Sequence, residues 1–345
     1  MKKLKIFKVA IIGCGNIFPM HAESIKGLEN TRIVAVCDVK KVRAVDKAKQ
    51  YDCKYYTDYK EMLSKEEVDV VHICLPHYLH AQVSIYASNK GKHVLTEKPM
   101  SIKLSDAEAM IKAAKDNNVT LGVIFQNRYN PGSRLIKNTL ESGELGKMLA
   151  GKLQVTWNRS DEYYSHSDWK GTWDMEGGGV IIDQAIHTMD LMRWFVDSDI
   201  DYIDANISNR AHDIIEVEDS AEGVIKYKNG VVTAFHAINY YTYDSPVEIE
   251  LHCEKGIATM VGDRAHVKFN DGREFIADTN TSETFNYGDG VKGYWGVSHT
   301  KQIKNYYSSI SAGLMPDING EEAIKTQKMI CGIYESGTKR VKIEL

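Results

Sequence analysis

Over the first third of the chain, short runs of apolar and β-branched residues alternate with longer segments of helical periodicity. The apolar runs are FKVAIIG, TRIVAVCD, DVVHICLP, KHVLTEKP and VTLGVIF. The segments that have the length and periodicity of helices are 19–29, 40–51, 79–89 and 104–117. Strands that alternate with crossover helices are typical of an α/β fold, so the pattern predicts a doubly wound parallel sheet.

The pattern changes after residue 124. A helical segment at 133–142 and the strand GKLQVTWN precede a glycine-rich stretch with its own helix, and paired strands follow. Their hairpin signals are Asn229-Gly230, Lys255-Gly256 and Asp271-Gly272. The tail returns to helix in HTKQIKNYYSSISAG and GEEAIKTQKMICGIYESG. We therefore expect a parallel-sheet domain at residues 1–124 and an α+β domain with a mostly antiparallel sheet at residues 125–345.

Composition narrows the class of protein. A chain of 345 residues is long enough for two domains, each with its own core. The formal net charge of -4 and the shortness of the basic clusters argue against a nucleic-acid partner. Six scattered cysteines without a C-x-x-C pair favour reduced thiols in a cytoplasmic protein. No apolar run approaches the roughly 18 residues of a membrane span, so we expect no membrane partner.

A glycine-rich turn follows the first predicted strand. Gly13-Cys14-Gly15-Asn16-Ile17-Phe18 opens a helix, and the next strand ends at the acidic Asp38. Glycines at this position let backbone amides and the helix N-terminus approach a pyrophosphate, while the carboxylate binds the adenosine ribose. The predicted cofactor contacts of this segment are Gly13, Gly15, Asn16, Ile17 and Asp38. The alternative is a glycine turn in an α/β domain that binds no nucleotide.

The residues around Asp38 bear on the choice of cofactor. Its carboxylate would repel the 2′-phosphate of NADP, which favours NAD. Lys40, Lys41 and Arg43 follow directly, and their charges could neutralise that phosphate. NAD is therefore favoured, with NADP as the alternative.

A second motif ends the strand KHVLTEKP. Glu97, Lys98 and Pro99 stand at the carboxyl edge, where open α/β sheets bind their ligands. A lysine beside a nicotinamide could bond both cofactor and substrate, and so polarise a carbonyl or steady an alkoxide. Taken alone, a Glu-Lys pair is more often solvated at the surface.

Four segments together resemble one family. A G-x-G cradle, LPHYLHAQVSIYASNKGKHVLTEKPM, GGGVIIDQAIHTMDLMRWF and YWGVSHTKQI are similar to the glucose-fructose oxidoreductase / inositol dehydrogenase family, Gfo/Idh/MocA. The resemblance implies a Rossmann domain, a C-terminal domain with a large open sheet, NAD(P), and a sugar, polyol or nucleotide-sugar substrate. It places Lys98 near the nicotinamide, and oligomers of relatives imply a homodimer or homotetramer formed through the sheet.

The resemblance also implies cofactor contacts beyond the glycine turn. Leu75, Pro76 and His80 match the family, whereas His77 stands where relatives commonly have Asn. Two alternatives follow: His77 alters the contacts to the cofactor ribose, or it substitutes for the Asn amide. The implied cofactor contacts outside the turn are Leu75, Pro76, His77, His80, Glu97, Lys98 and Gln126.

Three glycines precede a carboxylate and an imidazole. Gly177, Gly178 and Gly179 would allow the backbone to approach a bound ligand closely. Four residues make about one helical turn, so Asp183 and His187 should share one face, with Asp190 and Trp194 continuing the stripe. Such a pair can bind neighbouring sugar hydroxyls, and an imidazole can act as a general base at neutral pH. The alternative is an ordinary amphipathic helix.

These residues predict a mechanism. His187 would take the proton of a substrate hydroxyl while hydride leaves the same carbon for the nicotinamide; Lys98 would orient the oxygen, and Asp183 would hold the substrate or Lys98. No metal is expected, because Asp183 and His187 have no obvious third ligand and alcohol oxidation by NAD needs none. The expected catalytic residues are therefore Lys98, Asp183 and His187.

Further substrate contacts are less specific. Arg128 and Tyr129 follow the last strand of the first domain, and the resemblance places a late histidine, His299, near the substrate. Trp169 offers a face for sugar C–H groups. Arg159 and Lys170 are cations that could bind an anionic group. The predicted substrate contacts are Lys98, Arg128, Tyr129, Trp169, Asp183, His187 and His299.

Three functions remain open from the sequence. The first is an NAD(P)-dependent dehydrogenase that acts on a secondary alcohol of a sugar or cyclitol. The second is a glycoside hydrolase that uses tightly held NAD for transient oxidation and elimination. The third is a dinucleotide-binding regulator without catalysis, which would not need Lys98, Asp183 and His187 together.

Overall fold

The computed structural model describes residues 5–278, 287 and 298–345, and the chain divides into two compact units. The first unit consists of Met1–Gln126 and Thr284–Ile324, and the second of Asn127–Glu283 and Lys325–Leu345. The expected boundary at residue 124 therefore lies close to the first crossing at 126. A single boundary does not describe the chain, because residues 284–324 return to the first unit.

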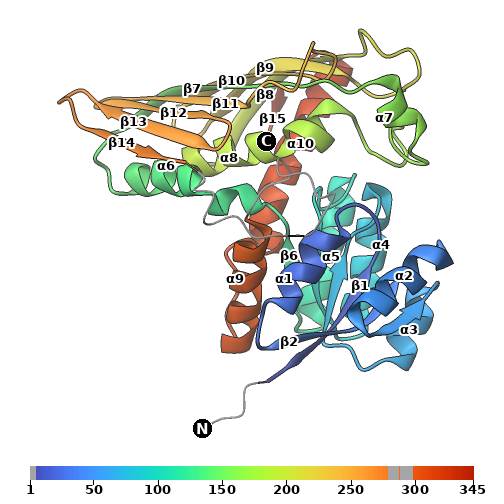
Figure 1. The fold of residues 1–345 in the computed structure, drawn as a ribbon. Coiled ribbons are helices and arrows are strands. Elements are labelled where there is room, and N and C mark those ends of the chain that lie inside the picture. The colour runs from blue at the N-terminus through green and yellow to red at the C-terminus, as the bar shows by residue number, and fades with distance from the viewer. Residues whose placement is uncertain (1–4, 279–286, 288–297) are drawn as a thin grey trace. The chain divides into compact units, whose positions relative to one another are not determined.

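The first unit contains a six-stranded parallel sheet with the order β3-β2-β1-β4-β5-β6 (Figure 1). Its strands are β1 (Phe7–Ile12), β2 (Thr31–Cys37), β3 (Lys54–Tyr56), β4 (Val70–Ile73), β5 (His93–Thr96) and β6 (Leu121–Val123). All four residues of β4 are buried, as expected for a central parallel strand that is covered on both faces. The predicted doubly wound parallel sheet is confirmed.

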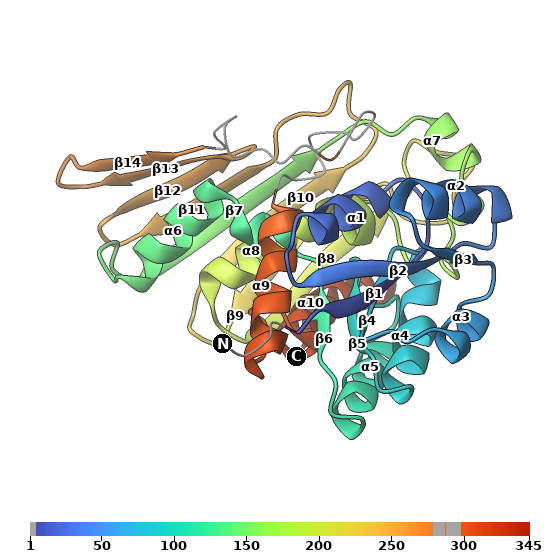
Figure 2. The ribbon, with the colours of Figure 1, turned by 60° about the horizontal axis from the view of Figure 1, so that its bottom comes forward.

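Helices cover both faces of this sheet (Figure 2). They are α1 (Phe18–Lys26), α2 (Lys41–Tyr51), α3 (Tyr59–Lys65), the 3-10 turn η1 (His77–Leu79), α4 (His80–Asn89) and α5 (Leu104–Asp116). The four predicted crossover helices are all present, with ends that differ by up to three residues. The sequence pattern missed α3 and the short strand β3, because three to seven residues show too little periodicity to be recognised.

A late helix completes the core of the first unit. Helix α9 (His299–Ala312) lies beside α1, where the hydroxyls of Ser24 and Thr300 are 2.8 Å apart. Tyr306 and Tyr307 of α9 are each 1% exposed and pack in the same apolar cluster as Phe7. Their burial is the physical reason why this segment belongs to the first unit and not to the second.

The second unit contains a nine-stranded mixed sheet with the order β14-β13-β12-β11-β7-β10-β9-β8-β15. Its strands are β7 (Met148–Thr156), β8 (Ile200–Ser208), β9 (Ser220–Tyr227), β10 (Val232–Ile238), β11 (Glu248–Cys253), β12 (Gly256–Val261), β13 (Arg264–Phe269), β14 (Glu274–Ala277) and β15 (Ile343–Glu344). Only the pair of β7 and β10 is parallel among the pairs between these strands. The three hairpins predicted at Asn229-Gly230, Lys255-Gly256 and Asp271-Gly272 are confirmed.

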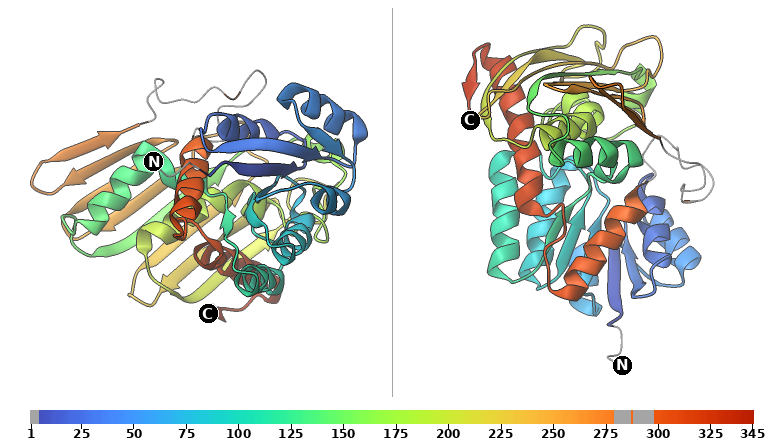
Figure 3. Two further views of the ribbon diagram at one scale, coloured as in Figure 1. Left: turned by 90° about the horizontal axis from the view of Figure 1, so that it is seen from below. Right: turned by 90° about the vertical axis from the view of Figure 1, so that its left-hand side faces the viewer.

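One face of the nine-stranded sheet carries the helices of the second unit (Figure 3). These are α6 (Pro131–Glu141), α8 (Ile186–Val196) and α10 (Gly320–Lys339), which begins in the first unit. The second unit also contains α7 (Asp161–Ser165), and the 3-10 turn η2 (Gln126–Tyr129) begins at the last residue of the first unit's N-terminal segment. Along β7, Leu153 and Val155 are buried whereas Lys152 and Gln154 are exposed. This alternation is typical of a sheet with one covered face and one open face.

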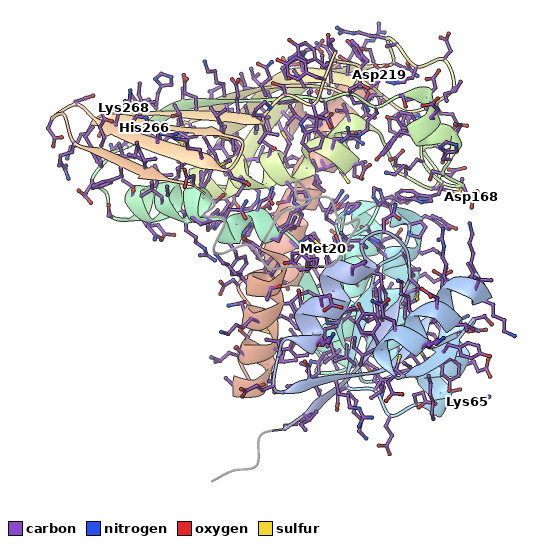
Figure 4. The ribbon with its side chains drawn as sticks, in the orientation of Figure 1. Met20, Lys65, Asp168, Asp219, His266 and Lys268 are labelled. Carbon is purple, nitrogen blue, oxygen red and sulfur yellow. The ribbon has the colours of Figure 1, made fainter. Side chains whose placement is uncertain are left out.

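Figure 4 shows the open face on β13, where His266 and Lys268 point away from α6. Exposed apolar side chains lie among such polar groups: Val232, Ile257, Val261 and Ile276 are 37% to 51% exposed. The strand register places all four on the face of His266 and Lys268. In the described part of the chain, no helix combines the length and the hydropathy that crossing a membrane requires.

Candidate functional site

The glycine turn between β1 and α1 has the geometry of a dinucleotide cradle. Gly13 has φ +98°, and a Cβ atom there would lie 2.0 Å from the carbonyl oxygen of Cys74. Among the described residues, apart from Gly15 and its two chain neighbours, no atom lies within 4 Å of the Cβ position of Gly15, so that residue borders open space. Together with the N-terminus of α1, this opening leaves room for a pyrophosphate against backbone amides. The residues present therefore fit a bound dinucleotide.

The Asp38 side chain is hydrogen-bonded to the same turn. Its Oδ2 accepts a hydrogen bond of 2.9 Å from the Cys14 amide, and its Oδ1 accepts one of 2.8 Å from the Lys40 amide. The carboxylate is 8% exposed and follows the end of β2 directly. Asp38 thus fixes the glycine turn from the position at which an acidic residue would meet the ribose of NAD.

The loop after β4 is fixed by a histidine. The ring nitrogens of His80 lie 2.7 Å from the Pro99 carbonyl oxygen and 2.8 Å from that of Leu75. His77 is 4% exposed and lies in η1, directly before α4. Burial lowers the pKa of His80. This imidazole therefore connects the loops that follow β4 and β5, which carry Leu75, Pro76 and Lys98.

Glu97 is a buried carboxylate at the end of β5. Its side chain is 8% exposed, and Oε1 lies 2.9 Å from Nε2 of His21 and 3.4 Å from Nε2 of His299. Burial acts to raise the pKa of Glu97, but the hydrogen bonds from these imidazoles hold it well below its ordinary value. Oε2 accepts a hydrogen bond of 3.2 Å from the amide of Lys98. The Glu97-Lys98 pair is therefore not the solvated pair that such a sequence usually indicates.

The structure places His299 within this cluster. The residue begins α9 and is 1% exposed, and its ring contacts Glu97 in the first unit. The tyrosine, tryptophan and glycine at 294–296, which precede it in the YWGVSHTKQI segment, lie outside the described residues. Nothing in the sequence indicates that His21, Glu97 and His299 meet, because they are distant along the chain.

Two of the three glycines before Asp183, Gly178 and Gly179, pack tightly against other parts of the second unit. A Cβ on Gly178 would lie 2.0 Å from the hydroxyl of Tyr334, and one on Gly179 would lie 1.9 Å from the Glu218 carbonyl oxygen. The close approach at Gly178 and Gly179 is therefore to atoms of the protein itself. Glu218 also accepts hydrogen bonds from the Gly179 and Ile181 amides at 2.8 and 3.0 Å.

Asp183 lies in a π-helical stretch, η3 (Val180–Ala185), which leads directly into α8. Its Oδ2 accepts hydrogen bonds from the Tyr163 hydroxyl at 2.8 Å and from Nε2 of Gln184 at 2.9 Å, and from the ammonium group of Lys170. His187 is the second residue of α8 and is partly buried. π-Helical turns are rare overall but frequent at functional sites, and here one contains the carboxylate and leads directly into the helix that carries the imidazole.

Lys170 is held between two carboxylates. Its Nζ contacts Asp183 and lies 3.3 Å from Oε1 of Glu176, and it lies 4.5 Å from the ring centroid of Trp169. Burial acts to lower the pKa of Lys170, but Asp183, Tyr163 and Glu176 hold it well above its ordinary value. Burial raises the pKa of Glu176 to about 7. From the sequence, Lys170 was one of several cations that could bind an anion, and its pairing with Asp183 was missed.

Arg128 forms a buried ion pair. Its Nε and Nη2 donate to the two oxygens of Asp190 at 2.7 and 2.6 Å, and both residues are at most 3% exposed. Asp190 also accepts a hydrogen bond from the hydroxyl of Thr326 at 2.6 Å. Asp190 is therefore paired within the second unit, with Arg128 and Thr326. Tyr129 stacks under the guanidinium of Arg134, 4.6 Å from the ring centroid.

A doubly wound sheet with this cradle, followed by a large mixed sheet, defines a Rossmann-type dinucleotide-binding protein. Residues 7–125 match the family described as "Oxidoreductase family, NAD-binding Rossmann fold", and residues 133–259 match the "GFO/IDH/MocA C-terminal domain". The chain therefore belongs to the GFO/IDH/MocA oxidoreductases, and its first unit is an NAD-binding domain. The resemblance and the cofactor expected from the sequence are confirmed.

Known relatives are similar over much of the chain. The chain is 24% identical to the myo-inositol 2-dehydrogenase of Thermotoga maritima over 91% of each protein. It is 25% identical to the levoglucosan dehydrogenase of Pseudarthrobacter phenanthrenivorans, over 74% of this chain and 75% of that protein. The solved WlbA dehydrogenase from Chromobacterium violaceum, in complex with NADH and UDP-GlcNAcA, has a TM-score of 0.87 at 26% identity, over 100% of this chain and 97% of that one.

Two glycine variants test the cradle. Gly15→Ala should leave the melting temperature of the cofactor-free protein unchanged and weaken NAD binding at least tenfold, because its Cβ would enter the opening. Gly13→Ala should instead destabilise the protein itself, because its Cβ would clash with Cys74. Calorimetric titration with NAD and thermal unfolding measure the two effects. Wild-type NAD affinity in Gly15→Ala would exclude this turn as the pyrophosphate site.

The Arg128–Asp190 pair predicts a large loss of stability. Asp190→Asn keeps the volume of the side chain but leaves a buried guanidinium without its counter-charge, so unfolding in urea should become easier by about 3–5 kcal/mol. Glu222→Gln is the matched control, because its ion pair with Arg210 is exposed and should be worth about 0–1 kcal/mol. If the two variants unfolded at the same urea concentration, a structural role of Arg128 would be contradicted.

Proposed function

We propose that the protein transfers a hydride between a secondary alcohol of a sugar, cyclitol or sugar derivative and the nicotinamide of NAD. The observation that carries this proposal is Lys98, which follows a buried carboxylate at the carboxyl end of β5 in a unit that matches the NAD-binding family. Ligands of open α/β sheets bind at that edge. When bound, NAD supplies the carbon that accepts or donates the hydride.

The relatives support the substrate class. Their names specify inositol and levoglucosan as substrates of dehydrogenases, and the WlbA dehydrogenase binds UDP-GlcNAcA. All three compounds carry ring hydroxyls on secondary carbons. Asp38 favours NAD over NADP, because a carboxylate beside the ribose repels a 2′-phosphate. We also propose a cytoplasmic location, because all six cysteines have free thiols in the structure.

We assign the catalytic roles to Lys98, Asp183 and His187. The Lys98 ammonium would bind the substrate oxygen and stabilise negative charge on it, which lowers the barrier to hydride loss. His187 would take the hydroxyl proton in oxidation and return it in reduction. Asp183 already accepts hydrogen bonds from Tyr163, Gln184 and Lys170, so it would orient neighbouring donors instead of moving protons itself.

The open face of the nine-stranded sheet is the surface that we propose for self-association. Val232, Ile257, Val261 and Ile276 expose apolar area there, and the opposite face is covered by helices. A two-fold axis through this face would pair each patch with its copy and bury all of them at once. A homodimer, or a tetramer built from two such dimers, is the assembly that these features favour.

The proposed reaction is tested by a spectrophotometric screen. Purified protein is mixed with NAD⁺ or NADP⁺ and a panel of sugars, inositols and nucleotide sugars, with nitrophenyl glycosides in parallel wells. Reduced nicotinamide should accumulate with NAD⁺ and at least one secondary alcohol. Lys98→Met and His187→Gln should each reduce turnover by about 10²–10⁴-fold without a change in melting temperature, because each removes one catalytic group.

Two outcomes of this screen would contradict the proposal. Release of nitrophenol without net formation of NADH would point to a hydrolase that retains its cofactor. Turnover at the wild-type rate in both variants would remove Lys98 and His187 from the mechanism. Glu108→Gln, an exposed change on α5 of the first unit, is the control for nonspecific effects of substitution.

Sedimentation velocity tests the assembly. Ile257→Glu combined with Val261→Glu places charges on the open face, so the protein should sediment as the 38.9 kDa monomer while the wild type sediments as a dimer or tetramer. Leu314→Glu is the control, because that exposed leucine belongs to the first unit. A monomeric wild type, or a double variant with the wild-type mass, would refute self-association through this face.

A further inference from the structure

Four buried side chains form a continuous chain of polar contacts inside the first unit. The hydroxyl of Tyr307 on α9 lies 2.9 Å from Nε2 of His72 on β4. Nδ1 of His72 lies 2.8 Å from Nδ1 of His21 on α1. Nε2 of His21 lies 2.9 Å from Oε1 of Glu97 at the end of β5. The chain thus connects three elements that are far apart in the sequence to the residue directly before Lys98.

The four side chains are buried, so their contacts with one another determine the direction of the hydrogen bonds. His21 and His72 are 0% exposed, Tyr307 is 1% exposed and Glu97 is 6% exposed. Each short contact needs one hydrogen, supplied by one of its two partners, because two bare nitrogens or two N–H groups at such distances would repel each other. The protonation of one member therefore fixes the tautomers of the others.

The direction follows from the carboxylate end. An ionised Glu97 can only accept, so His21 must donate from Nε2. Nδ1 of a neutral His21 is then an acceptor, so His72 must donate to it from Nδ1. Nε2 of a neutral His72 is in turn an acceptor, so the Tyr307 hydroxyl must donate to it. Every hydrogen bond in the chain then points toward Glu97.

Neutral imidazoles agree with the surroundings. Burial lowers the pKa of His21, and it lowers the pKa of His72 well below the ordinary value. The other titratable groups that act on Glu97 or its neighbours are His299 from α9, Cys74 after β4, His80 from α4 and Lys98 itself. A cationic His21 would reverse the chain, since it would donate to His72, which would then donate to Tyr307.

We propose that Tyr307, His72 and His21 form a one-directional hydrogen-bond chain that holds the Glu97 carboxylate in place and thereby positions Lys98 for hydride transfer. The link to Lys98 is the contact between its amide and Oε2 of Glu97. Donors that polarise one another in sequence strengthen the last bond of a chain, here the bond to the carboxylate. The three are positioning residues, and their effect on catalysis rests on the proposed function of Lys98.

Two adjacent tyrosines provide a matched test. Tyr306 and Tyr307 are both 1% exposed on α9, but the Tyr306 hydroxyl lies 3.0 and 3.1 Å from the carbonyl oxygens of Val94 and Thr120, outside the chain. Tyr307→Phe removes the first donor of the chain, whereas Tyr306→Phe removes an equally buried hydroxyl that bonds backbone carbonyl oxygens instead of a member of the chain. Both changes keep the aromatic ring and its packing.

The first readout is nitrogen-15 NMR of the histidine rings in the full-length protein, without substrate. The wild type should show two buried neutral rings of opposite tautomer, His21 with hydrogen on Nε2 and His72 with hydrogen on Nδ1. Tyr307→Phe should shift both signals, and Tyr306→Phe should shift neither. A doubly protonated His21, or signals that are unchanged in Tyr307→Phe, would overturn the chain. The wild-type spectrum decides the direction even if a variant fails to fold.

The second readout is kinetic, with a substrate found in the screen. Tyr307→Phe should lower kcat about tenfold with little change in KM, because the donor acts through a charged group and not on substrate binding. Tyr306→Phe should keep the wild-type kcat even if its melting temperature falls. Equal kcat in both variants would reduce the chain to a structural role. If the wild type turns over no secondary alcohol, the proposed function fails, while the NMR result still decides the chain.

Discussion

Glu97 brings a negative charge into the interior of the first unit, where a carboxylate is strongly destabilising unless hydrogen-bond donors surround it. Its donors come from His21 on α1 and His299 on α9, and the amide of Lys98 adds a third. The buried carboxylate therefore depends on the return of α9, because His299 is 202 residues distant along the chain from Glu97. Glu97 also accepts a hydrogen bond from the Lys98 amide and so holds the backbone at Lys98 in place. The contacts that stabilise the buried charge therefore also position the residue at the carboxyl end of β5.

In the second unit, hydrogen-bond donors likewise surround the carboxylate of Asp183. Lys170, Tyr163 and Gln184 converge on one carboxylate oxygen, and Glu176 shares the ammonium of Lys170. The π-helical turn and the glycines before it fit this arrangement, because Gly178 and Gly179 must pass close to Tyr334 and Glu218. Asp183 is thus surrounded by partners of its own unit, which fix its position before any ligand arrives.

Much of the fold could be predicted from the sequence, because its signals are local. One signal is the alternation of β-branched runs with amphipathic segments, and the other is the Asn-Gly or Asp-Gly turn. The doubly wound sheet and the hairpins followed from them. Tertiary contacts were not readable: nothing in HTKQIKNYYSSISAG indicates that Tyr306 and Tyr307 pack against β1 and not in the second unit. The glycine turn and Asp38 were found because their spacing reflects a local mechanism. His21, His72 and Lys170 were missed as partners because contacts between distant segments leave no spacing pattern, and a π-helical turn has no sequence signature.

Transfer of deuterium tests the central claim most directly. A sugar or cyclitol that the enzyme turns over is labelled with deuterium on its reacting carbon, and the nicotinamide of the product is examined by mass spectrometry and NMR. Hydride transfer predicts one deuterium at C4 of the reduced nicotinamide, and none there when Lys98→Met replaces the wild type. Deuterium found only in the sugar product or in the solvent, with no labelled NADH released, would contradict the account.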